Sequence, residues 1–261
     1  MSVFKIQNRK EVFAWSLYDF ANQPFTTIIV TFIYSAFFVK VIAVNEQEGT
    51  FLWTSAIAIT AVVVSLLSPL LGALADRGGF RKFFLITSTF ICAVFSILLY
   101  FPTEGEVYYA LTCFVIANIA FEMGSVFCNS YLPDLSNSKN IGRISGYSWG
   151  LGFVGGLLAL FLSLFLFDIN NPDEIRKINI LVGVWFLLFS IPTFLFVNDK
   201  KKEKFNRVHV KSSFESLKDT FKSIGNYRKI YRFLIARLFF NDGLITIFAL
   251  GGVYAVGTLD F

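Results

Sequence analysis

The chain has 261 residues, of which 55% are hydrophobic and only 16% are charged, and its mean hydropathy is +0.63. An average soluble domain carries about 25% charged residues, so this chain has too little polar surface to coat a globule in water. The composition therefore argues strongly against a soluble enzyme and against a soluble nucleic-acid-binding protein, although the net charge is +5.

Apolar runs of membrane-spanning length follow one another along the whole chain. A spanning helix needs roughly 20 apolar residues to cross about 30 Å of hydrocarbon. The runs cover residues 13–44, 51–75, 83–101, 107–132, 145–167, 178–197 and 231 onward. We therefore expect an all-α integral membrane protein with about seven spans. The first run is too long for a signal peptide and has no clear cleavage site, so we interpret it as a retained signal anchor.

The connections between the runs are short, with the exception of a basic stretch in the second half of the chain. We expect three parts: a six-helix transmembrane half at 1–197, a basic cytoplasmic loop at 198–230, and a seventh helix at 231–261. Within the loop, a capping-box pattern from Ser212 to Glu215 precedes apolar residues at helical spacing. This pattern predicts a short amphipathic helix that lies on the membrane surface.

The basic residues predict the orientation of the chain in the membrane. If the N-terminus is inside, 19 of the 23 Lys and Arg residues fall in inner segments. Those segments are residues 1–14, 76–82, 133–144 and 198–232. Because Lys and Arg concentrate in cytoplasmic loops, we predict a cytoplasmic N-terminus, and the membrane that we expect is a bacterial inner membrane. The net positive charge follows from this asymmetry, and we expect no nucleic-acid partner.

Ionisable residues lie inside three of the expected spans. They are Asp19 in the first span, Glu122 in the fourth, and Arg237 with Asp242 in the seventh. A charge at the centre of a spanning helix costs about 2.5 to 3.5 kcal/mol on insertion scales, so each of these residues needs an explanation.

Each intramembrane charge belongs to a stripe of polar residues at helical spacing. A stripe of this kind faces either another helix or a water-filled cavity, and we favour a cavity where a carboxylate stands at its centre. Pro24 lies beside the first stripe and either marks a broken helix near a binding site or is a tolerated kink. The residues that we expect along a solute or proton pathway are Asp19, Asn22, Gln23, Asn118, Glu122, Asn129, Arg237, Asn241 and Asp242.

One motif resembles a hydrolase site but lacks its context. Residues 146–150 match G-x-S-x-G, the nucleophile elbow of hydrolases. That elbow needs a strand, a helix and a histidine partner, whereas this motif opens an apolar run and the single histidine, His209, lies in the basic loop. We therefore predict helix packing at these small residues instead of catalysis. The packing glycines that we expect are Gly146, Gly150, Gly152 and Gly156.

Nothing in the sequence indicates a metal, a cofactor or ATP hydrolysis. The glycines beside Arg81 and Lys82 lack a Walker-type motif, and all three cysteines lie within apolar runs, where cysteine usually behaves as a small hydrophobic residue. We expect neither an enzyme nor a disulfide framework.

The stretch from Gly72 to Lys82, G-A-L-A-D-R-G-G-F-R-K, resembles the signature loop between helices 2 and 3 of major facilitator superfamily transporters, G-x-x-x-D-R-x-G-R-R/K. Phe80 takes the place of the first basic residue of the final pair. Residues 15–22, 142–152 and 241–243 narrow the resemblance to the branch related to the autophagy-linked vacuolar amino-acid effluxers. The resemblance covers essentially the whole chain.

This resemblance implies a fold of two six-helix halves whose helices 1, 4, 7 and 10 line a central cavity. It also implies that Asp76, Arg77 and Arg81 form a cytoplasmic gate against a helix of the second half. The whole gate motif comprises Gly72, Asp76, Arg77, Gly79, Arg81 and Lys82. We therefore expect the chain to be the front part of a transporter that stops after helix 7, with the missing C-terminal half of the same protein as its partner.

The predicted function is secondary active transport of a small polar solute, such as an amino acid, across the lipid bilayer by alternating access, with proton coupling as an option. Asp19 and Glu122 would carry protons or meet a substrate ammonium group, and Arg237 would meet a carboxylate. Two alternatives remain open: a membrane scaffold or receptor whose polar stripes only pack helices, and a homodimeric half-transporter.

Overall fold

The computed structural model describes residues 9–199 and 228–258, with the backbone alone for some residues near the ends of α3 and α10. Its elements in chain order are α1 (Arg9–Pro24), η1 (Phe25–Phe32), α2 (Tyr34–Phe37), η2 (Phe38–Ile42), α3 (Glu46–Gly78), α4 (Arg81–Leu98), α5 (Val107–Asn129), α6 (Leu132–Leu135), α7 (Ile141–Leu166), α8 (Pro172–Phe196) and α10 (Arg228–Thr258). The expected amphipathic helix at residues 212–224 lies outside the described residues.

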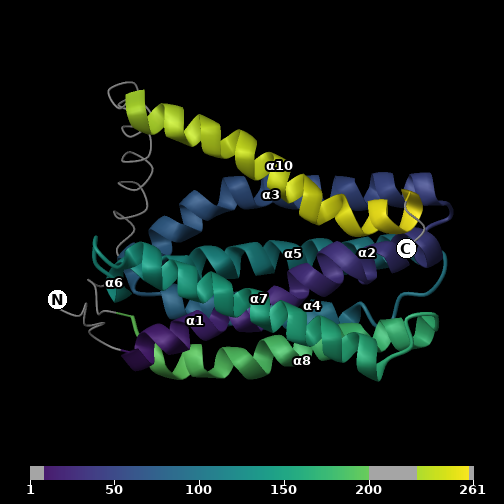
Figure 1. Cartoon of the computed structure of the whole chain (residues 1–261), viewed down its shortest axis with the longest axis horizontal. Coiled ribbons are helices and arrows are strands. Elements are labelled where there is room, and N and C mark those ends of the chain that lie inside the picture. The colour runs from purple at the N-terminus through teal and green to yellow at the C-terminus, as the bar shows by residue number, and fades with distance from the viewer. Residues whose placement is uncertain (1–8, 200–227, 259–261) are drawn as a thin grey trace.

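The structure confirms an all-α membrane fold in the described part of the chain (Figure 1). Six helical segments there are long and apolar enough to cross a membrane, and the first of them combines α1, η1, α2 and η2. Many large apolar side chains on these helices are exposed, as a lipid-facing surface requires. Cys92, Cys113 and Cys128 are all buried free thiols, in agreement with their apolar settings.

Several helices begin earlier than the apolar runs predict, because polar residues cap them. The second apolar run begins at Phe51, but α3 begins at Glu46, where the Asn45 side chain accepts a hydrogen bond from the amide of Glu48 at 2.9 Å. The sixth run begins at Ile178, but α8 begins at Pro172 after the cap Asn171. Apolar runs thus indicate where a span crosses the hydrocarbon and caps determine where its helix starts.

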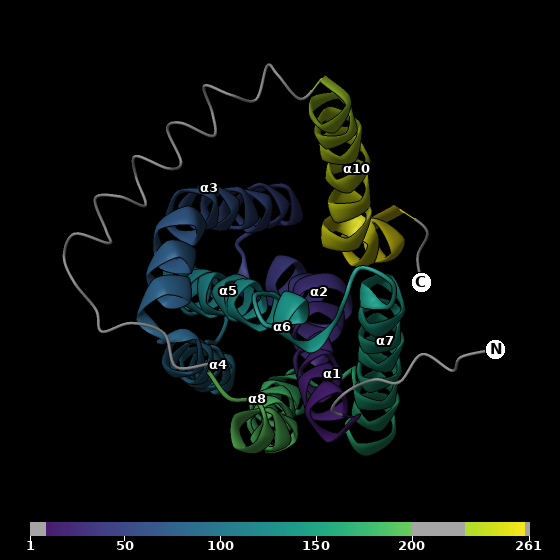
Figure 2. The ribbon, with the colours of Figure 1, turned by 90° about the vertical axis from the view of Figure 1, so that its left-hand side faces the viewer.

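Two groups of helices meet at α8, as the end-on view in Figure 2 shows. In one group α1 packs against α7 and α8, and in the other α4 packs against α5 and α8. Helix α3 packs against α5, and α10 contacts η1, α2 and α3 at the side of the bundle. The elements α1, η1, α5, α7 and α10 therefore surround one region, although they are far apart in the sequence.

The first span is not one uniform α-helix, because it changes to π-helix after Pro24. The amide of Ile33 donates to the carbonyl of Ile28, five residues earlier, at 2.9 Å. Proline has no N–H, so the carbonyl four residues before Pro24, that of Phe20, cannot receive the usual helical hydrogen bond. Trp185 of α8 donates its indole N–H to this carbonyl at 3.2 Å.

Candidate functional site

A cavity of about 360 Å³ lies between the first span and helices α5, α7 and α10. This volume is within the usual range for small-molecule sites, roughly 300 to 1,000 Å³. Its lining combines one carboxylate, one guanidinium, several amides and hydroxyls, and aromatic rings. The lining residues are Asp19, Asn22, Gln23, Thr26, Phe121, Ser125, Asn129, Trp149, Gly152, Phe153, Arg237, Asn241, Leu244 and Ile245.

The structure brings together most of the residues that the sequence placed on a pathway. Those in the cavity lining are Asp19, Asn22, Gln23, Asn129, Arg237 and Asn241. The polar stripe of the first span and the stripe of α10 thus face the same space. Helix α10 continues without interruption through Gly243, so the chain does not unwind between Arg237 and Asp242.

Three of the expected pathway residues do not belong to this lining: Asn118, Glu122 and Asp242. Asn118 is buried, whereas Glu122 and Asp242 are exposed. Neighbouring residues of an α-helix point about 100° apart, so Phe121 and Asn241 can face the cavity while the residue that follows each of them points elsewhere. Phe121 also stacks on Phe25 of η1, with ring centroids 5.0 Å apart.

Asp19 is held in the cavity wall by a residue of α7. The hydroxyl of Ser148 donates to Oδ2 of Asp19 at 2.5 Å, and Ser148 is only 1% exposed. Among the described residues no Lys or Arg forms an ion pair with Asp19. Ser148 is the central residue of the G-x-S-x-G pattern. In a hydrolase that serine is the nucleophile, whereas here it donates a hydrogen bond to Asp19.

Aromatic residues form a part of the cavity that polar spacing did not reveal. Trp149 and Phe153 of α7 both line the cavity, and their ring centroids are 5.8 Å apart in an edge-to-face arrangement. The two residues are four apart on one face of the helix, which is a pattern that the sequence does contain. Aromatic faces next to a carboxylate suit the binding of an organic cation.

Small residues of α7 allow close contact with the first span, but not all at the expected positions. A Cβ at Gly152 would lie 3.2 Å from Cβ of Asp19, and one at Gly156 would lie 2.6 Å from Oγ1 of Thr27. Gly155 was not among the expected packing glycines, yet a Cβ there would collide with the carbonyl oxygen of Phe20.

Gly146 and Gly150, in contrast, have no described neighbour within 4 Å of the position of a Cβ. The described structure thus shows no packing contact at these two glycines, and the expectation for them stays a prediction. Gly152 and Gly156, four residues apart, share a face of the helix, and only that face of α7 meets α1 and η1.

The predicted gate motif lies between α3 and α4. Gly79 directly follows α3 as its C-cap and has φ of +67°, a left-handed conformation that strongly favours glycine. This conformation explains why the motif has a glycine there. Gly72 has open space around it, and the side chains of Asp76 and Arg77 lie outside the described part of the structure. The motif residues with described polar contacts are therefore Arg81 and Lys82.

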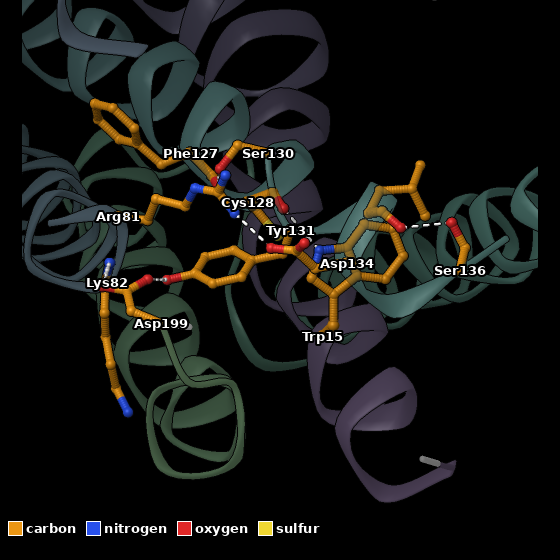
Figure 3. Close-up of polar contacts among 11 residues, drawn as sticks. Trp15, Arg81, Lys82, Phe127, Cys128, Ser130, Tyr131, Asp134, Ser136 and Asp199 are labelled. Carbon is orange, nitrogen blue, oxygen red and sulfur yellow. Dashed lines mark hydrogen bonds and ion pairs between the residues drawn. The ribbon is translucent and has the colours of Figure 1, made fainter. Parts of the chain in front are cut away.

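Arg81 contacts a helix end of its own bundle. Its Nη1 lies 2.8 Å from Oδ2 of Asp134 in α6, and its guanidinium lies 5.6 Å from the ring centroid of Tyr131 (Figure 3). The resemblance implied an interaction with the second half of a transporter. In the described structure this arginine joins the start of α4 to α6 and to Tyr131, the residue just before it.

A residue at the end of α8 caps the start of α4. Phe80 occupies the N-cap position and offers no side-chain hydrogen bond. The carboxylate of Asp199 accepts from the amide of Lys82 at 3.2 Å and from the hydroxyl of Tyr131 at 2.6 Å (Figure 3). Asp199 thus supplies a cap from 117 positions away in the chain and joins the segment after α8 to the start of α4 and to the connection between α5 and α6.

A match to a protein-family model shows which family the chain belongs to. A family model described as "Vacuole effluxer Atg22 like" matches residues 39–261, which is more than half of the chain. The chain belongs to this family. The resemblance to major facilitator transporters related to vacuolar effluxers is thereby confirmed.

Curated relatives of this Atg22-like chain come from bacteria and fungi. It is 27% identical to the "Uncharacterized MFS-type transporter YxiO" of Bacillus subtilis, over 94% of this chain and 60% of that protein. It is 23% identical to "Autophagy-related protein 22" of Yarrowia lipolytica, over 80% of this chain and 49% of that protein. The chain therefore spans about half to three fifths of the length of these relatives. No solved structure gives a significant match to it.

Proposed function

We propose that the described bundle is the amino-terminal half, and α10 the first helix of the second half, of a secondary transporter that moves a small polar solute across a membrane by alternating access. In this proposal residues 1–197 form the first half, 198–230 a cytoplasmic loop and 231–261 the beginning of the second half. The observation that carries the proposal is the cavity between the first span, α5, α7 and α10, because helices from both expected halves contribute to it.

The lining of the cavity supports a zwitterionic solute such as an amino acid. Asp19 offers a carboxylate for an ammonium group, and Arg237 offers a guanidinium for a carboxylate. Amide side chains such as Asn22 and Asn241 add donors and acceptors of no net charge. Two opposite charges in the lining of one cavity favour a solute that carries both complementary charges over one that carries neither.

Asp19 is also the proposed site of proton coupling. A carboxyl group that lines a cavity inside the membrane can change its protonation state when the cavity opens to either side. The family supports a transporter in general terms, and the cavity chemistry supports the proposal of an amino-acid substrate.

The test uses proteoliposomes that contain the whole transporter, including its second half. It measures the uptake of an isotope-labelled amino-acid mixture in the presence and in the absence of a pH gradient. We expect Asp19→Asn to lower the rate roughly ten-fold or more, because one charge-assisted contact to the solute is lost. Glu122→Gln should have a smaller effect, since Glu122 does not line the cavity. Asp168→Asn, in the exposed connection between α7 and α8, is the matched control and should transport at the original rate.

An unchanged rate and an unchanged response to the pH gradient in Asp19→Asn would contradict the proposal. The second candidate is a membrane scaffold whose polar residues only join helices, and the hydrogen bond between Ser148 of α7 and Asp19 of α1 is the observation that favours it. A scaffold would move no solute, and loss of Asp19 would reduce its stability instead.

A further inference from the structure

Ser148 of α7 has no place in the transport scheme described so far, and no histidine among the described residues could activate it as a nucleophile. Its side chain is buried and faces α1, while its neighbour Trp149 lines the cavity. The residue therefore lies behind the cavity wall and not in the open space. Its hydroxyl reaches one functional group there, the carboxylate of Asp19, at 2.5 Å.

Glycines on the same face of α7 make this short contact possible. A Cβ at Gly152 would lie 3.3 Å from the carbonyl oxygen of Asp19, and a Cβ at Gly155 would collide with the carbonyl oxygen of Phe20. Any larger residue at Gly155 would push α7 away from α1, because the obstacle is backbone and cannot rotate aside. The close contact between the helices thus holds the hydroxyl of Ser148 against Asp19.

Other charged groups around α1 do not take over this role. Arg237 on α10 lines the same cavity, but it forms no ion pair with Asp19. The remaining charged residues on the helices that contact the first span are Glu46, Glu48, Asp76 and Arg77 on α3, Glu122 on α5, Arg143 on α7, Asp173, Glu174, Arg176 and Lys177 near the start of α8, and Arg228, Lys229, Arg232 and Asp242 on α10. Among the described residues, Ser148 is the only side chain that forms a hydrogen bond with Asp19.

We propose that Ser148 is the positioning residue of Asp19, which holds the carboxyl group at the cavity wall in both its ionised and its neutral form. A serine hydroxyl can rotate, so it donates a hydrogen bond to a carboxylate and accepts one from a carboxylic acid. The side chain of Asp19 thus keeps a partner when a proton or an ammonium group arrives or leaves. This inference rests on the proposed function, in which Asp19 is the group that binds the solute or the proton.

The experiment compares the reactivity of Asp19 in variants of the full chain in detergent. A water-soluble carbodiimide and an amine convert the carboxyl of Asp19 to an amide, and mass spectrometry of the peptide that contains Asp19 measures the rate. We expect Ser148→Ala to react roughly ten-fold faster, since the carboxyl loses its one hydrogen bond from a side chain. Ser148→Thr keeps the hydroxyl and should restore a rate close to the original.

Ser163→Ala is the matched control on the same face of α7. Ser163 is fully buried like Ser148, but its hydroxyl donates to the carbonyl of Ala159 in its own helix at 2.8 Å. The reactivity of Asp19 should not change in this control. Ser148→Cys preserves the size of the side chain with a weaker donor, and it replaces Ser148→Ala in the comparison if the alanine variant does not fold.

Equal reactivity of Asp19 in the original chain and in Ser148→Ala would overturn the positioning role, as would an equal increase in Ser163→Ala. Transport measurements on the same variants separate this inference from the proposed function. If Asp19→Asn abolishes transport while Ser148→Ala changes neither transport nor reactivity, the function stands and the role of Ser148 falls. If the transporter moves no amino acid at all, the proposed function falls, and the reactivity of Asp19 still decides the role of Ser148.

Discussion

Pro24 shows how one residue changes the contacts of a whole site. Because it has no N–H, it leaves the carbonyl of Phe20 without its helical partner, and this carbonyl lies beside the cavity residue Asp19 in the chain. Trp185 reaches across from α8 to donate a hydrogen bond to it at 3.2 Å. The indole also stacks on the ring of Phe20, with centroids 5.4 Å apart. One side chain therefore both donates a hydrogen bond to the backbone of Phe20 and packs against its ring.

We predict that Trp185→Phe destabilises the protein by about 1 to 3 kcal/mol, because the ring contacts remain but the carbonyl of Phe20 loses its donor. Thermal unfolding in detergent measures the change. Trp149→Phe is the control, since Trp149 is 60% exposed and should alter stability by about 0.5 kcal/mol at most. Equal effects of the two substitutions would show that the hydrogen bond to Phe20 contributes nothing.

At the scale of helices, the start of α4 depends on a residue from another part of the chain. Its N-cap position holds Phe80, where the family pattern has a basic residue, and a phenylalanine side chain cannot accept a hydrogen bond from the first turn. Asp199, which follows α8, accepts from the amide of Lys82 instead, and the negative carboxylate also suits the positive end of the helix dipole.

We predict that Asp199→Ala lowers the free energy of unfolding by about 1 to 2 kcal/mol, the usual loss for a helix cap. Tyr131→Phe removes the second donor to the same carboxylate. It should therefore have less effect in the Asp199→Ala background than alone. Thermal unfolding of the two single variants and the double variant measures this coupling, and Glu104→Ala in the exposed connection between α4 and α5 is the control. Additive effects of the two substitutions would contradict a shared contact.

At the scale of the whole molecule, the described segments that the sequence assigns to the cytoplasm lie at one end of the bundle. The start of α1, the connection from α3 to α4, helix α6 and the end of α8 all lie toward the left in Figure 1, and the connection from α7 to α8 lies at the opposite end. This arrangement agrees with an N-terminus and basic loops on the same side of the membrane. Which side that is remains a prediction from the distribution of Lys and Arg.

Cysteine labelling in intact cells tests this orientation. We expect a membrane-impermeant maleimide to label Asn170→Cys in intact cells and Lys139→Cys only after the membrane is opened. Both positions are exposed, whereas the native cysteines are buried, so the unaltered chain serves as the background control. The reverse labelling pattern would place the N-terminus outside.

The periodicity of the chain predicted the polar faces well, but only part of each face reaches the cavity. Asp19, Asn22 and Gln23 line it together, as their spacing on one helix suggests. Glu122 was expected beside them and is exposed instead. The spacing of residues along a helix determines which of them share a face, yet it contains no information about which neighbouring helix that face meets or at what depth.

The sequence by itself determined the class of protein, the number of complete spans in the described part, the helices that carry intramembrane charge, and the family, because these depend on composition and on contacts within one helix. Only the tertiary structure decided that Ser148 holds Asp19 and that Asp199 caps α4. These partners are 129 and 117 positions apart in the chain. These contacts form only when whole helices pack closely. Gly155, for example, lets α7 approach the backbone of Phe20 in α1. A local sequence pattern contains no information about such an approach between distant helices.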